Sequence, residues 1–172
     1  RVQGYQVDAT TGKITGNVGD IQTQAALLAP KPTTTAVITG NLDARGSDAL
    51  AAFDVTNAAT YNATTSMAVF DSQGNSRTLD LYFRRTSDAN NTFDVYSFLD
   101  GNNTTGGAGA IITALPFTTA GAYNTTGDKG NQAITVAAAD GVAAIDIALD
   151  ITGLTQFGSN FAINTASQNG HS

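Results

Sequence analysis

The chain has 172 residues, which suits one sizeable domain or one domain with part of a second. Only 13% of the residues are charged and the net charge is −6, so the clustered Lys and Arg that a nucleic acid or an anionic membrane surface would need are absent. There is no cysteine and no apolar run of the roughly 18 residues that a membrane span needs. We therefore predict no nucleic-acid partner, no membrane partner and no disulfide, which fits either a cytosolic protein or one exported unfolded.

Residues 1–38 are predicted to be a Gly- and Thr-rich extended segment. A turn signal covers residues 8–13, and residues 22–28 could form a short helical turn that two prolines then end. Residues 33–38 predict a strand, because β-branched side chains follow one another there. The alanine-rich residues 48–52 could be helical, although flanking Gly and β-branched residues weaken that prediction.

The clearest pattern lies between residues 62 and 99 and predicts an antiparallel meander. Its strands are expected over 66–70, 76–83 and 93–98, with turns at 71–75 and 88–91. Apolar and polar residues alternate in the second strand, so one face is expected to be buried. Three such strands are about the minimum for an independently stable sheet.

The remainder of the chain is predicted to begin with loops and to return to strands. Residues 100–132 are loop-rich, and the stretch 100–107 is not expected to hold regular structure. Four apolar residues should pin these loops to the core: Ile111, Ile112, Leu115 and Phe117. Further strands are expected over 133–138, 143–151, 154–157 and 161–163, with a turn at 140–141. The predicted fold class is all-β, with an antiparallel, barrel-like domain.

No residue pattern predicts a catalytic, cofactor-binding or metal site, so we expect neither an enzyme nor a cofactor. His171, the single histidine, stands beside the last residue, where a catalytic triad or zinc site has no pocket. There is no Glu, and most Asp residues fall in turns or on polar strand faces, where they accept hydrogen bonds. Residues 100–103 offer too few oxygen ligands for a calcium loop. We interpret the basic pair Arg84-Arg85 as solvated charge at a strand end.

Residues Tyr61–Phe83 closely resemble a hairpin of the bacterial flagellar hook protein family. They share its Tyr-Asn start, its Val-Phe-Asp-Ser-Gln-Gly turn and its Leu-Asp-Leu-Tyr-Phe return. Further stretches match the family in the same order: Val2–Tyr5, Lys31–Thr35, Gly40–Ala44, Ile151–Phe157 and Gln168–Gly170. His171 stands where the family usually has an aromatic residue. The resemblance spans nearly the whole chain.

The resemblance implies a structural subunit of the hook, the flexible joint between the motor rod and the filament. Residues 39–165 would form the outer β domain, 1–38 would be an extended segment of a second, inner β domain, and 166–172 would return to it. The chain is then expected to be a monomeric fragment without the terminal helices that polymerise. The whole protein would be exported unfolded to the cell exterior by the type III apparatus. Its partners would be further copies of itself and the hook cap, rod and hook–filament junction proteins.

Other readings of the sequence stay open. Another flagellar axial protein, such as a distal rod or hook-associated subunit, would share much of this pattern. An extracellular carbohydrate-binding β module would need an exposed aromatic platform, for which the candidates are Tyr61, Tyr82, Tyr96 and Tyr123. A glycoside hydrolase would need two opposed carboxylates. A surface rich in Thr, Asn, Ser and Ala favours contacts that water can replace, as sliding subunits need. The sequence does not identify the subunit-contact residues.

Overall fold

The computed structural model describes residues 3–8, 10–20, 29–47, 51–87, 92–138 and 143–172. Within these ranges the chain is built of strands, with one short 3-10 helix at Ala58–Thr60. The described residues contain no helix long and apolar enough to cross a bilayer. The all-β fold class is confirmed. Some predicted features lie outside the described residues: the helical turn at 22–28, residues 48–50 of the alanine-rich segment, and the turns at 88–91 and 140–141.

Strands β1 (Gln3–Val7) and β2 (Ile14–Asp20) form a two-stranded antiparallel sheet, which we call the N-terminal ribbon. The predicted turn between them is confirmed, since the Asp8 carboxylate accepts the backbone N–H groups of Thr10 at 2.9 Å and Thr11 at 2.7 Å. Directly paired residues place the ribbon's apolar side chains on one face: Tyr5 opposite Val18, and Val7 opposite Ile14. All four are exposed.

The predicted meander is confirmed as β4 (Ala63–Phe70), β5 (Ser76–Ser87) and β6 (Thr92–Leu99), each longer than expected. Two short strands, β7 (Asn102–Asn103) and β8 (Ile112–Pro116), pair with β6 and complete this meander sheet. The prediction that residues 100–107 hold no regular structure is wrong at β7. Asp100 and Gly101 both take positive φ, and this tight turn brings β7 back against the end of β6.

The second sheet, which we call the mixed sheet, is centred on β3 (Thr35–Asp43). Strand β12 (Ala162–Gln168) pairs antiparallel with β3, whereas β10 (Ile145–Asp150) and β11 (Leu154–Phe157) pair parallel with it. Strand β9 (Asn131–Val136) lies antiparallel beside β10. The strand predicted at 154–157 is present with the same ends, and those predicted at 33–38, 133–138, 143–151 and 161–163 are present with shifted ends. The parallel pairings were not predicted.

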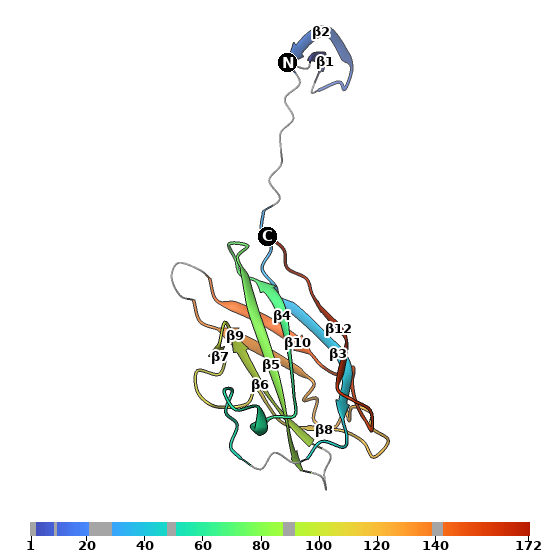
Figure 1. Cartoon of the computed structure of the whole chain (residues 1–172). Coiled ribbons are helices and arrows are strands. Elements are labelled where there is room, and N and C mark those ends of the chain that lie inside the picture. The colour runs from blue at the N-terminus through green and yellow to red at the C-terminus, as the bar shows by residue number, and fades with distance from the viewer. Residues whose placement is uncertain (1–2, 9, 21–28, 48–50, 88–91, 139–142) are drawn as a thin grey trace.

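The meander sheet and the mixed sheet pack face to face around one core, and we call the two together the sandwich (Figure 1). Leu81 and Phe83 from β5 and Ile147 and Leu149 from β10 belong to a single buried cluster and are at most 1% exposed. Each such side chain contributes about 1.5–3 kcal/mol by leaving water. The predicted pinning residues are confirmed: Ile112, Leu115 and Phe117 are buried and Ile111 is partly buried against the same cluster.

Candidate functional site

The basic pair Arg84-Arg85 lies within β5 and is not solvated, so its interpretation as free strand-end charge is wrong. Arg85 is 7% exposed, and its guanidinium donates to the carbonyl oxygens of Ala44, at 2.9 Å, and Gly46. Arg84 donates to the carbonyl of Ala51 at 3.0 Å and lies 3.7 Å from the Asp94 carboxylate. Strand β5 runs four residues past Phe83. Its successive side chains leave opposite faces, so Arg85 lies on the inner face with Phe83 and Arg84 on the outer face, and the two reach different parts of the loop that follows β3. Their role is to hold that loop.

The carboxylates that the sequence placed in turns and on polar strand faces make local hydrogen bonds. The Asp71 carboxylate is fully buried and accepts the backbone N–H groups of Gln73 and Asn75, both at 2.9 Å. Burial by itself would raise the pKa of Asp71, but the hydrogen bonds from Asn75 and Gln73 outweigh it and lower that pKa. Asp146 accepts the hydroxyl of Thr135 at 2.8 Å. Asp88 and Asp140 lie outside the described residues.

The residues considered for metal binding and catalysis are not brought together. The Asp100 carboxylate accepts the backbone N–H of Thr78 at 2.8 Å and pairs with Arg77, so its oxygens are already engaged. His171 is exposed and joins the fold through its backbone. Across the part of the chain that the structure describes, no group of three His or Asp side chains could hold a metal ion.

The tyrosines considered as a carbohydrate platform mostly pack against one another. Phe53, from the loop held by the two arginines, stacks on Tyr96 with ring centroids 3.8 Å apart and 9° between the planes. Tyr82 packs edge-on against Phe53, and Tyr61 and Phe98 pack edge-on against Tyr82. Burial raises the pKa values of Tyr82 and Tyr96. The cluster therefore covers the outer face of the meander sheet instead of offering flat rings to a sugar.

Tyr123 lies apart from that cluster and has a structural partner of its own. Its phenolic oxygen accepts the backbone N–H of Gly130 at 2.6 Å, and the side chain is half-buried against the core. A Cβ on Gly130 would lie 2.8 Å from the Tyr123 ring, so the close approach requires glycine. This tyrosine fastens the loop between β8 and β9.

An extensive set of specific contacts joins the two segments that connect to the sandwich, residues 29–34 and 168–172. Lys31 and His171 exchange both backbone hydrogen bonds at 2.9 Å. The hydroxyl of buried Thr33 donates to Gln168 Oε1 at 2.8 Å. The Asn169 side chain accepts the backbone N–H groups of residues 34 and 35 at 2.9 and 3.1 Å. We call this set of contacts the junction, and it lies at one end of the sandwich (Figure 1).

Glycine at position 170 allows the junction to close. A Cβ there would lie 2.4 Å from the Thr33 hydroxyl and 2.9 Å from the Lys31 carbonyl oxygen, distances that side chains do not adopt. No sequence pattern predicted the junction, although Gln168–Gly170 is one of the stretches that resemble the hook family. The signal that could have found it is the Asn-Gly pair, whose side-chain amide and missing Cβ suit a close approach of two backbones.

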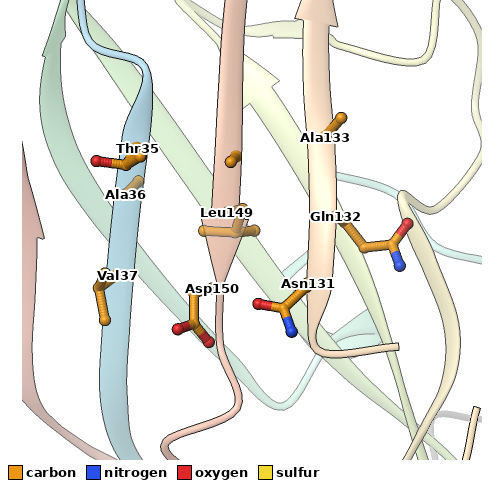
Figure 2. Close-up of a pocket in the computed structure, with 9 residues that line it drawn as sticks. Thr35, Ala36, Val37, Asn131, Gln132, Ala133, Leu149 and Asp150 are labelled. Carbon is orange, nitrogen blue, oxygen red and sulfur yellow. The ribbon is translucent and has the colours of Figure 1, made fainter. Parts of the chain in front are cut away.

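A shallow hollow of about 390 Å³ lies on the mixed sheet, across β3, β10 and β9 (Figure 2). Its middle row consists of Thr35, Ala148 and Ala133, which the strand register places side by side. The next row, Val37, Asp150 and Asn131, is larger and forms a rim. The hollow follows from small side chains in one row, and its lining offers little to orient a ligand.

These observations define an all-β sandwich whose most specific contacts hold its own loops and its two connecting segments. Residues 41–171 match the family described as the flagellar basal body protein FlaE D2 domain, and the chain belongs to this family. It is 37% identical over 102 residues to the flagellar hook protein FlgE of Escherichia coli strain K12, a match that covers 56% of this chain and 24% of that protein.

The fold also resembles a solved structure. The 32 kDa fragment of the flagellar hook protein FlgE from Caulobacter crescentus aligns with a TM-score of 0.50 and 20% identity, covering 63% of this chain and 46% of that one. The chain thus spans about a quarter of the hook protein it matches and less than half of the solved fragment. At this level of identity the second likeness concerns the fold alone.

Proposed function

We propose that this chain is the outer part of a structural subunit of the bacterial flagellar hook, the bent joint between the motor rod and the filament. The observation that carries the proposal is the junction, where both connecting segments meet at one end of the sandwich. A domain held in this way projects from the rest of its polypeptide like a lobe. The membership of residues 41–171 in a flagellar family supports placing that lobe in a flagellar subunit.

The division of the chain follows from the same proposal. Residues 39–165 are the outer β domain, residues 1–38 are an extended segment of an inner β domain, and residues 166–172 return to that domain. The exposed apolar face of the N-terminal ribbon supports this division, because an isolated two-stranded ribbon is marginally stable in water. The remainder of the whole subunit would cover that face.

The proposed partners are other copies of the same subunit, joined head to tail into a helical tube outside the cell. The hook cap, the rod and the hook–filament junction proteins are the proposed partners at the ends of the tube. Only 13% of the residues are charged, which supports contacts between subunits that contain few desolvated ion pairs. Breaking a buried ion pair costs about 3–5 kcal/mol, so a surface with few of them lets subunits slide as the tube bends.

Immunogold electron microscopy tests the proposed location. Antibodies raised against residues 29–172 are applied to the bacterium that produces the chain, with antibody pre-absorbed on the same protein as the control. We expect gold particles on the short curved segment between the cell surface and the filament. Gold along the whole filament or over the cell body would contradict the hook and favour another axial subunit or a surface-binding module.

A further inference from the structure

The turn between β4 and β5, residues Asp71–Asn75, is held more firmly than a hairpin connection requires. Besides the two backbone N–H groups, the Asp71 carboxylate accepts the side-chain amide of Asn75 at 3.0 Å. Two backbone hydrogen bonds, both of 3.1 Å, close the turn: the Asp71 N–H donates to the Asn75 carbonyl, and the Gly74 N–H donates to the Asp71 carbonyl. This many hydrogen bonds around one buried carboxylate make the turn rigid.

This turn touches both connecting segments of the junction. A Cβ on Gly74 would lie 2.6 Å from the Pro30 Cβ and 3.2 Å from the Ser172 Cα, so the turn's backbone lies directly against both. Just before the turn, two hydrogen bonds of 2.9 Å join Phe70 to Thr33. The Phe70 carbonyl oxygen accepts the Thr33 backbone N–H, and the Phe70 backbone N–H donates to the Thr33 hydroxyl. The turn belongs to the meander sheet, whereas β3 and β12, which lead to the connecting segments, belong to the mixed sheet.

The position of the turn has a mechanical consequence. The connecting segments pair with each other at one β-bridge, Lys31 with His171, and a single bridge leaves them free to bend together out of its plane. A contact from the opposite sheet meets both segments and opposes that motion. The glycines at 74 and 170 fit the arrangement, because each stands where a side chain would force the segments apart.

We propose that residues Asp71–Asn75 act as a bracket that fixes the direction in which the two connecting segments leave the sandwich. Gly74 and Asp71 are then positioning residues, and the outer domain is held at a set angle to the rest of its subunit instead of swivelling on its connection. The inference about hook mechanics rests on the proposed function, whereas the bracket itself is a property of this chain.

The chain offers a matched pair of substitutions for the test. Gly74 has φ +81° and meets the connecting segments, whereas Gly101 has φ +80° in another hairpin turn with nothing within 4 Å of a Cβ. Gly74→Ala and Gly101→Ala therefore impose the same backbone strain, and only the first disturbs the bracket. Amide hydrogen exchange of Lys31 and His171 is measured by NMR in the 172-residue chain. We expect Gly74→Ala to speed exchange at both amides about tenfold or more, and Gly101→Ala to leave them within about twofold.

A second variant avoids strain in the turn altogether. Thr33→Val keeps the side-chain shape but removes the hydroxyl that accepts the Phe70 N–H and donates to Gln168, so it should also speed exchange at Lys31 and His171. If neither Gly74→Ala nor Thr33→Val does so more than Gly101→Ala, the bracket is overturned.

The mechanical consequence is tested in the whole protein, by electron microscopy of hooks and by swimming speed. Gly74→Ala should alter hook curvature and slow swimming, and Gly101→Ala should not. If Gly74→Ala speeds amide exchange at Lys31 and His171 but leaves hook curvature and swimming speed unchanged, the bracket has no role in the hook. The gold-labelling result would still stand. Absence of gold from the hook would instead overturn the proposed function and leave the exchange result standing.

Discussion

The N-terminal ribbon and the meander sheet present similar alternations of apolar and polar residues but differ in what covers the apolar face. In the ribbon, the exposed fractions of the four apolar side chains run from 58% to 69%. In β5, Leu79, Leu81 and Phe83 are 0% exposed, because the mixed sheet lies across them. The difference in burial therefore depends on whether a second sheet packs on the strands, and not on the alternation within the strands themselves.

This contrast shows that a period-two pattern identifies which face of a strand is apolar without identifying its cover. The sandwich supplies its own cover by folding one sheet onto the other. The ribbon leaves its apolar face in water, which is the usual mark of a surface that another part of the protein or a partner covers. Substitutions on each side of the comparison should therefore have very different effects in this chain.

The largest effect is expected from Phe83→Ala, which removes a fully buried ring from the space between the sheets. Loss of the buried surface and the cavity left behind should lower the free energy of unfolding by about 3–5 kcal/mol. Urea unfolding measures this change. The control is Phe157→Ala, whose side chain is 49% exposed and which should cost less than about 1 kcal/mol. Equal losses for the two variants would mean that the inter-sheet core is not the main source of stability.

A smaller loss is expected from Arg85→Met, which keeps the length of the side chain but removes its bonds to the carbonyl oxygens of Ala44 and Gly46. Hydrogen bonds from a charged donor contribute about 1.5–3 kcal/mol, and we expect a loss near the lower end because these half-buried carbonyls can bind water instead. Lys13→Met, in the exposed turn of the ribbon, is the control. If the two variants unfold at the same urea concentration, Arg85 does not hold the loop.

A pH-dependent effect is expected at Asp43, the last residue of β3. Hydrogen bonds from the Arg45 guanidinium, at 2.7 and 2.9 Å, and from the Arg45 backbone N–H hold the pKa of Asp43 at about 2, below its ordinary value of 3.8. The lowered pKa in the folded state means that this contribution is present above pH 3.8 and is lost as the pH falls through about 2.

Asp43→Asn should therefore lower the melting temperature at neutral pH and make less difference at about pH 2, where the native carboxyl is itself partly protonated. Scanning calorimetry of both proteins at the two pH values measures the change. A difference in melting temperature that stays constant across this range would show that the Asp43–Arg45 pair is not stabilising.

The smallest effect is expected from Ile14→Ser on the ribbon. The side chain is 69% exposed, so the unfolding of this chain should change by no more than about 0.5 kcal/mol. In the whole protein, where we propose that this face is covered, the same substitution should cost about 2 kcal/mol or more. Thermal unfolding of both proteins gives the comparison. An unchanged whole protein would contradict the proposal that the inner domain covers the ribbon.

Much of the fold could be predicted from local sequence. The alternation in β5 and β10 indicated strands and their buried faces, and the Asp-Ser-Gln-Gly-Asn turn indicated the hairpin that joins β4 to β5. These signals are local, because adjacent strands and their turn are specified within about 20 residues of one another. The four pinning residues of the loop-rich segment could also be predicted, because isolated apolar side chains in a polar segment are stabilised by burial in the core.

The errors have a common physical origin. Arg85 looked solvated because its burial depends on a loop 39 to 41 residues earlier, whose carbonyl oxygens accept hydrogen bonds from the guanidinium. Tyr96 was a candidate for an exposed aromatic platform because its cover, Phe53, comes from a segment without periodic pattern. In both cases the deciding contact is with a loop, and loops have no repeating signal that links them to the strands they cover.

The sequence by itself determined an all-β chain, a three-stranded meander and the apolar faces of β5 and β10, because side-chain alternation and turn chemistry act over a few residues. Only the tertiary structure decided that β3 lies parallel to β10 and β11, that a loop covers the outer face of β6, and that the two connecting segments meet beneath the β4–β5 turn. Those features join residues 40 to 140 positions apart, and their pairing is selected by the shape of the whole core rather than by any local pattern.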